Sequence, residues 1–132
     1  MSHAKIVAAA SALILGLGGA VSAEEVGKAE YMNACASCHG ESGKGEGPLA
    51  ELMTVAVPDL TQLAANNDGE FPMLDVIMTV DGRSGIRGHG YPMPVWGSRF
   101  EAEAGDVGDY AAELEVRGRV LSIAYYLESI QE

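Results

Sequence analysis

The chain has 132 residues, of which 48% are hydrophobic and 20% are charged, and these values fit one globular domain around a single core. Its 19 acidic side chains outnumber its 8 basic ones, which gives a formal net charge of −11 at pH 7. Such a charge argues against nucleic acid as a partner and favours a basic docking surface on another protein.

The first residues have the composition of a secretory signal peptide. Lys5 precedes an uncharged run over residues 6–21, and small side chains at Val21 and Ala23 suit a signal peptidase. We expect cleavage after Ala23, so that residues 1–23 are a signal peptide and 24–132 form one exported, periplasmic domain with a net charge of −12 (7 basic and 19 acidic side chains). A retained membrane anchor is the alternative, but the run is shorter than the roughly 20 residues that cross a bilayer.

Residues 35–39 read Cys-Ala-Ser-Cys-His, the pattern of covalent c-type haem attachment, at the end of a helix expected from Glu24 to Cys38. Cys35 and Cys38 lie three positions apart on one helical turn, so both can form thioethers with the vinyl groups on one haem edge. His39 follows directly and is expected to bind the iron as the proximal axial ligand through a neutral imidazole nitrogen.

Three other uses of this cysteine pair remain as alternatives. A thioredoxin-like dithiol needs a strand before the motif, whereas helical sequence precedes it here. A closed zinc site is disfavoured, because the chain has no second cysteine pair and, beyond the signal peptide, only His39 and His89 as possible nitrogen ligands. A structural Cys35–Cys38 disulfide leaves His39 without a role.

The segment after the motif predicts a loop and two helices. Four glycines within residues 40–48 indicate a chain that wraps around the cofactor edge, and we expect a carbonyl near Pro48 to accept the second N–H of His39, unless Pro48 is a simple turn proline. A helix is expected from an Asp59 N-cap to about Asn66, with Gln62 reaching back to the cap amide, and another over residues 72–80.

Glycines and prolines predict a long irregular loop over residues 81–98, followed by an acidic, solvated connection over 101–109. The last helix is expected over 109–130, because apolar residues recur there at spacings of four and three, namely Val116, Val120, Ile123, Leu127 and Ile130. The expected fold is therefore all-α, with about four helices around one haem.

Met93 is the candidate for the distal axial ligand, because it lies between Pro92 and Pro94 in a restricted loop, and a thioether stabilises ferrous iron. His89 is its rival, and an open position is the third possibility. The other methionines of the mature chain are expected to fill the core: Met32, Met53, Met73 and Met78.

Three further residues of this region are candidates for the haem surroundings. Trp96 is expected near a haem edge or propionate, or in the core. Arg83 and Arg87 carry guanidinium groups that suit propionates, although surface arginines are the commoner case.

Together, Gly27-x-x-x-Tyr31-x-x-x-Cys35, Cys35-Ala-Ser-Cys-His39, Met93-Pro-Val-Trp96 and Tyr125-Tyr-Leu127 resemble the class I soluble cytochrome c family, and its bacterial periplasmic, single-haem members in particular. This resemblance implies that the first and last helices cross nearly at right angles, with Gly27 allowing close approach and Tyr31 meeting the turn over residues 123–126. The strong negative charge departs from the mitochondrial-type carriers.

The resemblance implies a one-electron carrier with haem c and no enzymatic reaction, no small-molecule substrate and redox proteins as partners. The alternative within the family is a haem c subunit that accepts electrons from a periplasmic dehydrogenase or feeds a terminal reductase. An enzyme or gas sensor with an open iron would need Met93 away from the iron and His89 as a distal acid or base.

Overall fold

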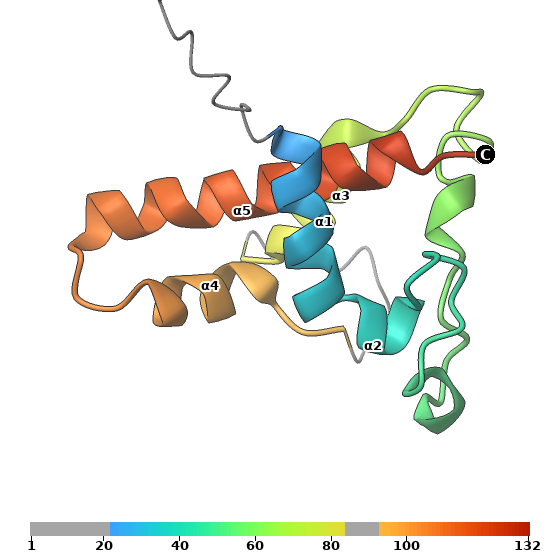
Figure 1. The fold of residues 1–132 in the computed structure, drawn as a ribbon, viewed down its shortest axis with the longest axis horizontal. Helices are drawn as coiled ribbons and strands as arrows, with labels where there is room; N and C mark the ends of the chain where they lie inside the picture. The colour runs from blue at the N-terminus through green and yellow to red at the C-terminus, as the bar shows by residue number, and fades with distance from the viewer. Residues whose placement is uncertain (1–21, 84–92) are drawn as a thin grey trace, which may run out of the picture.

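The computed structural model describes residues 22–83 and 93–132, and within these ranges the chain forms helices and no strand (Figure 1). The α-helices are α1 (Ala23–Ala34), α2 (Ala36–His39), α3 (Met73–Asp81), α4 (Trp96–Ala104) and α5 (Asp109–Ser129). Two 3-10 helices, η1 (Ala50–Leu52) and η2 (Leu60–Gln62), lie between α2 and α3. The all-α expectation is confirmed, and α4 is additional to the four helices that the sequence indicated.

The long C-terminal helix α5 forms the centre of the fold, with α1, α3 and α4 packed against it. Its predicted apolar stripe is buried, because Val116, Val120, Ile123 and Leu127 are all less than 5% exposed. The helix begins at Asp109, as expected, and its last turn ends one residue early, at Ser129. The hydrophobic effect of this stripe therefore holds the helices around one core.

Helices α1 and α5 cross steeply at a point where the sequence supplies a glycine (Figure 1). A Cβ atom on Gly27 would collide with the carbonyl group of Ser122 on α5, so only glycine allows this approach. One turn further along α1, the fully buried ring of Tyr31 packs against Tyr126 with ring centroids 5.1 Å apart. The helix crossing implied by the family resemblance is confirmed.

The helix expected over residues 24–38 is interrupted at Cys35. Helix α1 ends at Ala34, where the backbone N–H of Cys35 still donates to the carbonyl of Tyr31, and the chain then turns into the separate α2. At its start, the Ser22 hydroxyl accepts from the Glu25 amide while the Glu25 carboxylate accepts from the Ser22 amide, a capping box.

The helix expected from Asp59 to Asn66 is shorter than predicted. Asp59 is the N-cap and accepts from the Thr61 amide at 2.8 Å, but the helix ends at Gln62 as η2. The side-chain amide of Gln131 accepts from the Ala64 N–H at 2.8 Å and donates to the Leu60 carbonyl at 2.9 Å. It thus occupies both groups that would form the next helical hydrogen bond, which stops the helix there.

Helix α3 agrees with its prediction to within one residue at each end, and Gly82 terminates it with a left-handed φ of 68°. The expected loop over residues 81–98 is wrong at its far end, because α4 begins at Trp96. The expected solvated connection over 101–109 is also wrong in its first part, which continues α4 to Ala104.

Helix α4 is held by its apolar face and by one arginine. Phe100 is buried, and the guanidinium of Arg119 on α5 lies 3.8 Å from the centre of its ring. The same guanidinium contacts Glu103 of α4 at 2.8 Å and Glu30 of α1 at 2.9 Å. Arg119 therefore joins three helices, and Glu103 is its partner from the acidic stretch that was expected to be solvated.

Candidate functional site

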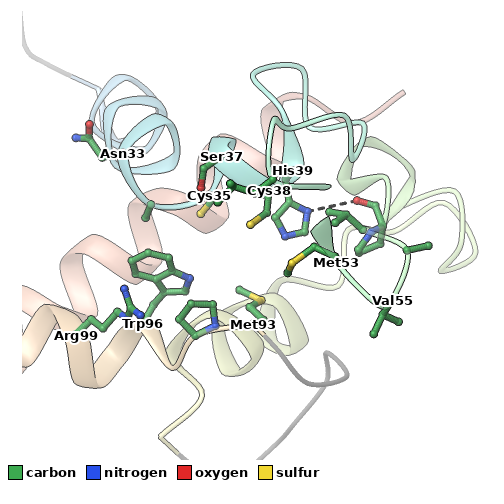
Figure 2. Close-up of a pocket in the computed structure, with 16 residues that line it drawn as sticks. Asn33, Cys35, Ser37, Cys38, His39, Met53, Val55, Met93, Trp96 and Arg99 are labelled. Atoms are coloured by element: carbon green, nitrogen blue, oxygen red, sulfur yellow. Dashed lines mark hydrogen bonds between the residues drawn. The ribbon is translucent and has the colours of Figure 1, made fainter. Parts of the chain in front are cut away.

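A pocket of about 630 Å³ lies beside α2, at the side of the molecule where α1 ends (Figure 2). Its walls come from three segments of the chain, and most of the lining surface is apolar. The lining residues are Asn33, Ala34, Cys35, Ser37, Cys38 and His39 from the first segment, Leu49, Met53, Val55, Ala56, Val57 and Pro58 from the second, and Met93, Pro94, Trp96 and Arg99 from the third. Its volume lies within the range of about 300–1,000 Å³ that is typical of small-molecule and cofactor sites.

The short helix α2 places both cysteines and the histidine on the pocket wall. The amides of Cys38 and His39 both donate to the carbonyl of Cys35, at 3.1 and 2.9 Å, which closes one helical turn over the motif. Cys35 and Cys38 are free thiols. Burial raises the pKa of the Cys35 thiol to about 12, so this side chain brings no charge into the pocket.

His39 is buried and held by a backbone oxygen. Its Nδ1 atom lies 3.4 Å from the carbonyl oxygen of Pro58, and the other side of the ring faces into the pocket (Figure 2). Burial lowers the pKa of the His39 imidazole below its ordinary value, against a smaller opposing effect of this carbonyl. A neutral imidazole with one nitrogen directed at a carbonyl is the arrangement of a metal-binding histidine.

The carbonyl beside His39 belongs to Pro58, so the expectation for Pro48 is wrong. Pro48 is exposed and does not line the pocket. The preceding Gly47 lies against the backbone of α2, where a Cβ atom would come within 2.6 Å of the Cys38 carbonyl, and its amide donates to that carbonyl at 3.1 Å. This contact holds Pro48 on the outer side of the motif.

The opposite wall of the pocket contains Met93 and the start of α4. The Met93 side chain lies in the same pocket as His39, and Trp96 lines the wall beside it (Figure 2). The Trp96 ring packs on Phe100 with centroids 5.7 Å apart and lies 5.2 Å from the Arg99 guanidinium carbon. The core thus fixes Trp96 on the pocket wall. From the sequence, this residue is expected near a haem edge or propionate, or in the core.

Arg83, a candidate for binding a propionate, is not among the residues that line the pocket. Its guanidinium is bonded to Asp81 at 2.7 Å and to Glu113 of α5 at 2.7 Å. Those two carboxylates occupy the donors that a propionate would have used. Arg87 and His89, the other candidates of this region, lie outside the described residues.

Arg99 and Met53 are among the pocket residues that reasoning from the sequence does not assign to the site. Arg99 lines the pocket three positions after Trp96 on α4. The sequence predicts no helix there, so it gives no reason to expect the two side chains on one helix face. Met53, which was assigned to the core, lines the pocket directly after η1. No sequence motif marks Met53, because its position depends on how the chain folds back from α2.

The family model for cytochrome c matches residues 24–112 of the chain, which includes the cysteine pair, His39 and Met93. No curated protein and no solved structure matches the chain in the corresponding comparisons. Proteins of this family hold haem c covalently, with its iron. The residues present fit this group, since two free thiols and a neutral imidazole face an apolar pocket of suitable volume. The chain belongs to the cytochrome c family.

Proposed function

We propose that the protein is a periplasmic one-electron carrier whose haem iron is bound by His39 and Met93. The observation that carries this proposal is that Cys35, Cys38, His39 and Met93, from segments more than 50 positions apart, line one pocket. An iron held by both residues would have no position left for a substrate. The protein is therefore proposed to transfer electrons and not to act as an enzyme.

The haem supplies an iron that alternates between the ferrous and ferric states. Cys35 and Cys38 anchor its edge, and His39 is oriented by the Pro58 carbonyl. Trp96 and the apolar walls exclude water, which lowers the reorganisation that accompanies a change of charge. Met93 contributes a thioether sulfur, which favours ferrous iron and raises the reduction potential.

Met93 is the better distal ligand of the two methionines in the pocket. Met53 follows η1, which is tied to the motif because the Leu49 amide donates to the Ser37 carbonyl at 2.9 Å. It therefore belongs to the wall that carries His39, whereas Met93 belongs to the wall of Trp96 (Figure 2). Met93 would therefore bind the iron across the pocket from His39, and Met53 would line the pocket.

The periplasmic location is supported by the signal-peptide pattern of residues 1–23. Within residues 22–83 and 93–132, no helix is long and apolar enough to span a membrane. Cleavage after Ala23 would remove Ser22, the N-cap of α1, and start the mature chain in the first helical turn. Intact mass of the protein from a periplasmic extract should equal that of residues 24–132 plus one haem, and a mass that retains residues 1–23 would contradict this location.

The proposed partners are redox proteins with basic docking surfaces, since the mature chain carries a formal charge of −12. A second candidate, a haem c subunit of a larger oxidoreductase, is favoured by exposed apolar side chains on the segment beside the pocket, namely Leu49, Leu52 and Val55. The two differ in their response to salt, because screening weakens a charged contact and leaves an apolar one in place.

The proposal is tested on protein matured with haem in a bacterial periplasm. We expect thioether-linked haem, a ferric spectrum with the charge-transfer band of methionine on iron, and a redox titration that fits one electron. Met93→Ala should abolish the band and lower the potential, whereas Met53→Ala, the matched control, should keep both. Covalent haem that is high-spin in the wild type and binds carbon monoxide would instead indicate an open iron, as in an enzyme or gas sensor.

A further inference from the structure

The two ends of the segment that leads to Met93 meet at a narrow contact, which we call the neck and define by Asp81, Gly82, Arg83, Val95 and Gly97. The chain leaves the neck after Arg83 and returns to it two residues after Met93. A Cβ atom on Gly82 would lie 3.3 Å from Cγ1 of Val95, so these residues touch. Interactions that fix the position of the neck therefore also fix the backbone next to Met93.

The second contact of the neck joins α3 and α4 without space for a side chain. A Cβ atom on Gly97 would come within 2.6 Å of the Arg83 Nε atom and would collide with the Asp81 carboxylate. Gly97 lies in the first turn of α4, directly after Trp96 of the pocket wall. The carboxylate and guanidinium thus form the surface on which the start of α4 rests.

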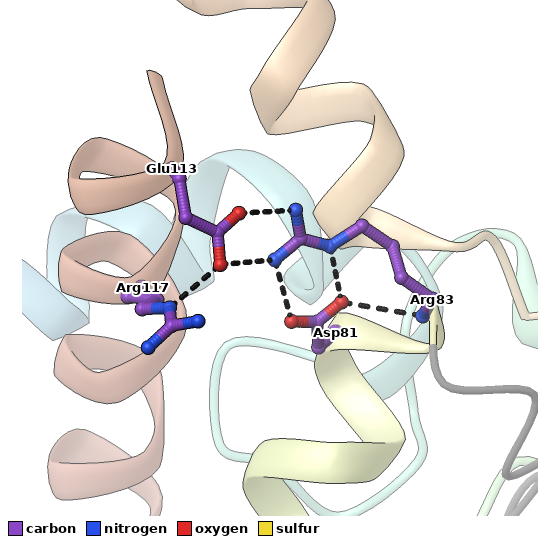
Figure 3. Close-up of polar contacts among 4 residues, drawn as sticks. All are labelled: Asp81, Arg83, Glu113 and Arg117. Atoms are coloured by element: carbon purple, nitrogen blue, oxygen red, sulfur yellow. Dashed lines mark hydrogen bonds and ion pairs between the residues drawn. The ribbon is translucent and has the colours of Figure 1, made fainter. Parts of the chain in front are cut away.

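The guanidinium of Arg83 connects this neck to α5 (Figure 3). Its Nε and Nη2 atoms donate to the two carboxylate oxygens of Asp81 at 2.7 and 2.9 Å, and its Nη1 atom donates to Glu113 at 2.7 Å. The backbone N–H of Arg83 also donates to Asp81, at 3.2 Å. Such a planar fork has a defined geometry that a lysine cannot reproduce.

The ion pairs of the neck are partly shielded from solvent, since the side chains of Arg83 and Asp81 are 24% and 23% exposed. Glu113 receives a second cation, Arg117, at 2.6 Å, but the Arg117 side chain is 73% exposed. Arg117 is therefore a matched control, because it contacts the same carboxylate and does not contact the neck.

We propose that Arg83 is a positioning residue for Met93: by binding Asp81 and Glu113 it fixes the neck to α5 and so holds the methionine sulfur at the haem iron. The inference rests on the proposed function, in which Met93 is the distal ligand. Residues that orient a metal ligand through hydrogen bonds commonly change metal–ligand affinity by about 10- to 100-fold when they are replaced. A rigid support matters here because the ligand itself lies on a segment between helices.

Competition by imidazole measures how strongly Met93 is bound to the iron, because imidazole binds the ferric haem only when the methionine dissociates. Loosening Met93 by a given factor raises the apparent affinity for imidazole by the same factor. We expect Arg83→Gln to bind imidazole at least about tenfold more tightly than the wild type. Arg83→Lys should show most of this effect, and Arg117→Gln should titrate like the wild type.

The outcomes separate this inference from the proposed function. A wild type without the methionine charge-transfer band would remove the proposed function and the inference with it. A wild type with the band, together with an Arg83→Gln variant that unfolds at lower temperature but binds imidazole as the wild type does, would overturn the positioning role alone. If Arg83→Gln does not fold with haem, Glu113→Gln replaces it, since this change removes the carboxylate that binds Arg83 to α5. Its unfolding temperature and its affinity for imidazole are then compared with those of the wild type in the same way.

Discussion

Tyr31 donates a hydrogen bond of 2.7 Å from its phenol to the backbone carbonyl of Gly40, the residue that follows His39. Tyr31 is fully buried on α1, where it also packs against Tyr126 of α5. Burial raises the pKa of the Tyr31 phenol above its ordinary value, so it stays a donor over the physiological pH range. The helix crossing and the end of the haem motif are thus joined by one side chain.

Tyr31→Phe removes this donor and leaves the buried Gly40 carbonyl with only the Gly43 amide, at 3.2 Å. We expect a loss of about 1–2 kcal/mol in the free energy of unfolding, measured by denaturant titration of the haem-loaded protein. Tyr125→Phe is the control, because Tyr125 is adjacent to the same packing site but exposed. Equal stabilities of the two variants would show that the hydrogen bond contributes nothing.

Gly27→Ala inserts a methyl group where α1 meets the Ser122 carbonyl, with the Tyr126 Cβ atom only 3.0 Å away. The Ser122 backbone cannot move aside as a flexible side chain can, so we expect the free energy of unfolding to fall by at least about 2 kcal/mol.

The matched control for Gly27 is Gly118→Ala on α5, where an added Cβ meets nothing within 4 Å. This change should stabilise the protein by about 0.5–1 kcal/mol through helix propensity. Thermal unfolding of both variants tests the pair, and similar effects at the two sites would contradict the close approach at Gly27.

The pKa of Asp81 is held below its ordinary value, chiefly by the hydrogen bond from Arg83 and against some desolvation. A carboxyl group whose pKa is lowered by folding contributes stability above its unfolded pKa of about 4, and that contribution disappears as the pH falls through the lower folded value. The stability difference between wild type and Asp81→Asn should therefore be about 1–2 kcal/mol at pH 7 and should vanish in stronger acid. Denaturation curves from pH 7 to pH 2 measure it, and a difference independent of pH would show that the charge of Asp81 is not involved.

The negative charge predicts how the protein exchanges electrons with small redox reagents. A cationic complex such as hexaammineruthenium should react faster than an anionic one such as ferrocyanide, relative to their self-exchange rates and driving forces. Raising the ionic strength from about 0.01 to 1 M should reduce this difference in rate between the two complexes, because the screening length shrinks from about 30 to 3 Å. Stopped-flow rates over this range test the prediction, and a gap that does not change with salt would contradict docking by charge.

The helices were predictable where a single apolar stripe decides them. The apolar stripe of α5, and the proline at the start and glycine at the end of α3, Pro72 and Gly82, indicated both helices almost to the residue. Helix α4 escaped prediction because its buried face is short, with only Gly97 and Phe100 as its buried residues. Its stability depends on Arg119, which comes from another helix and has no local signal.

The site was predictable to the extent that its chemistry is local. Cys35, Cys38 and His39 form one motif, and Pro94 marks Met93 as a restricted residue. The Pro58 carbonyl beside His39 could not be foreseen, because it depends on how a loop folds over the motif.

The contacts of Arg83 were likewise hidden from the sequence. An arginine in a glycine-rich loop gives no sign that two carboxylates, one of them 30 positions away, will bind it.

The most direct test of the account is an NMR spectrum of the reduced, haem-loaded protein labelled with ¹³C at its methionine methyl groups. The chain has six methionines, and five of them lie beyond the proposed signal peptide that contains Met1. We predict one methyl resonance shifted far upfield by the haem ring, absent in Met93→Ala and retained in Met53→Ala. A shifted resonance that survives Met93→Ala, or a wild type without one, would contradict the assignment of Met93 as the ligand that makes this protein a closed electron carrier.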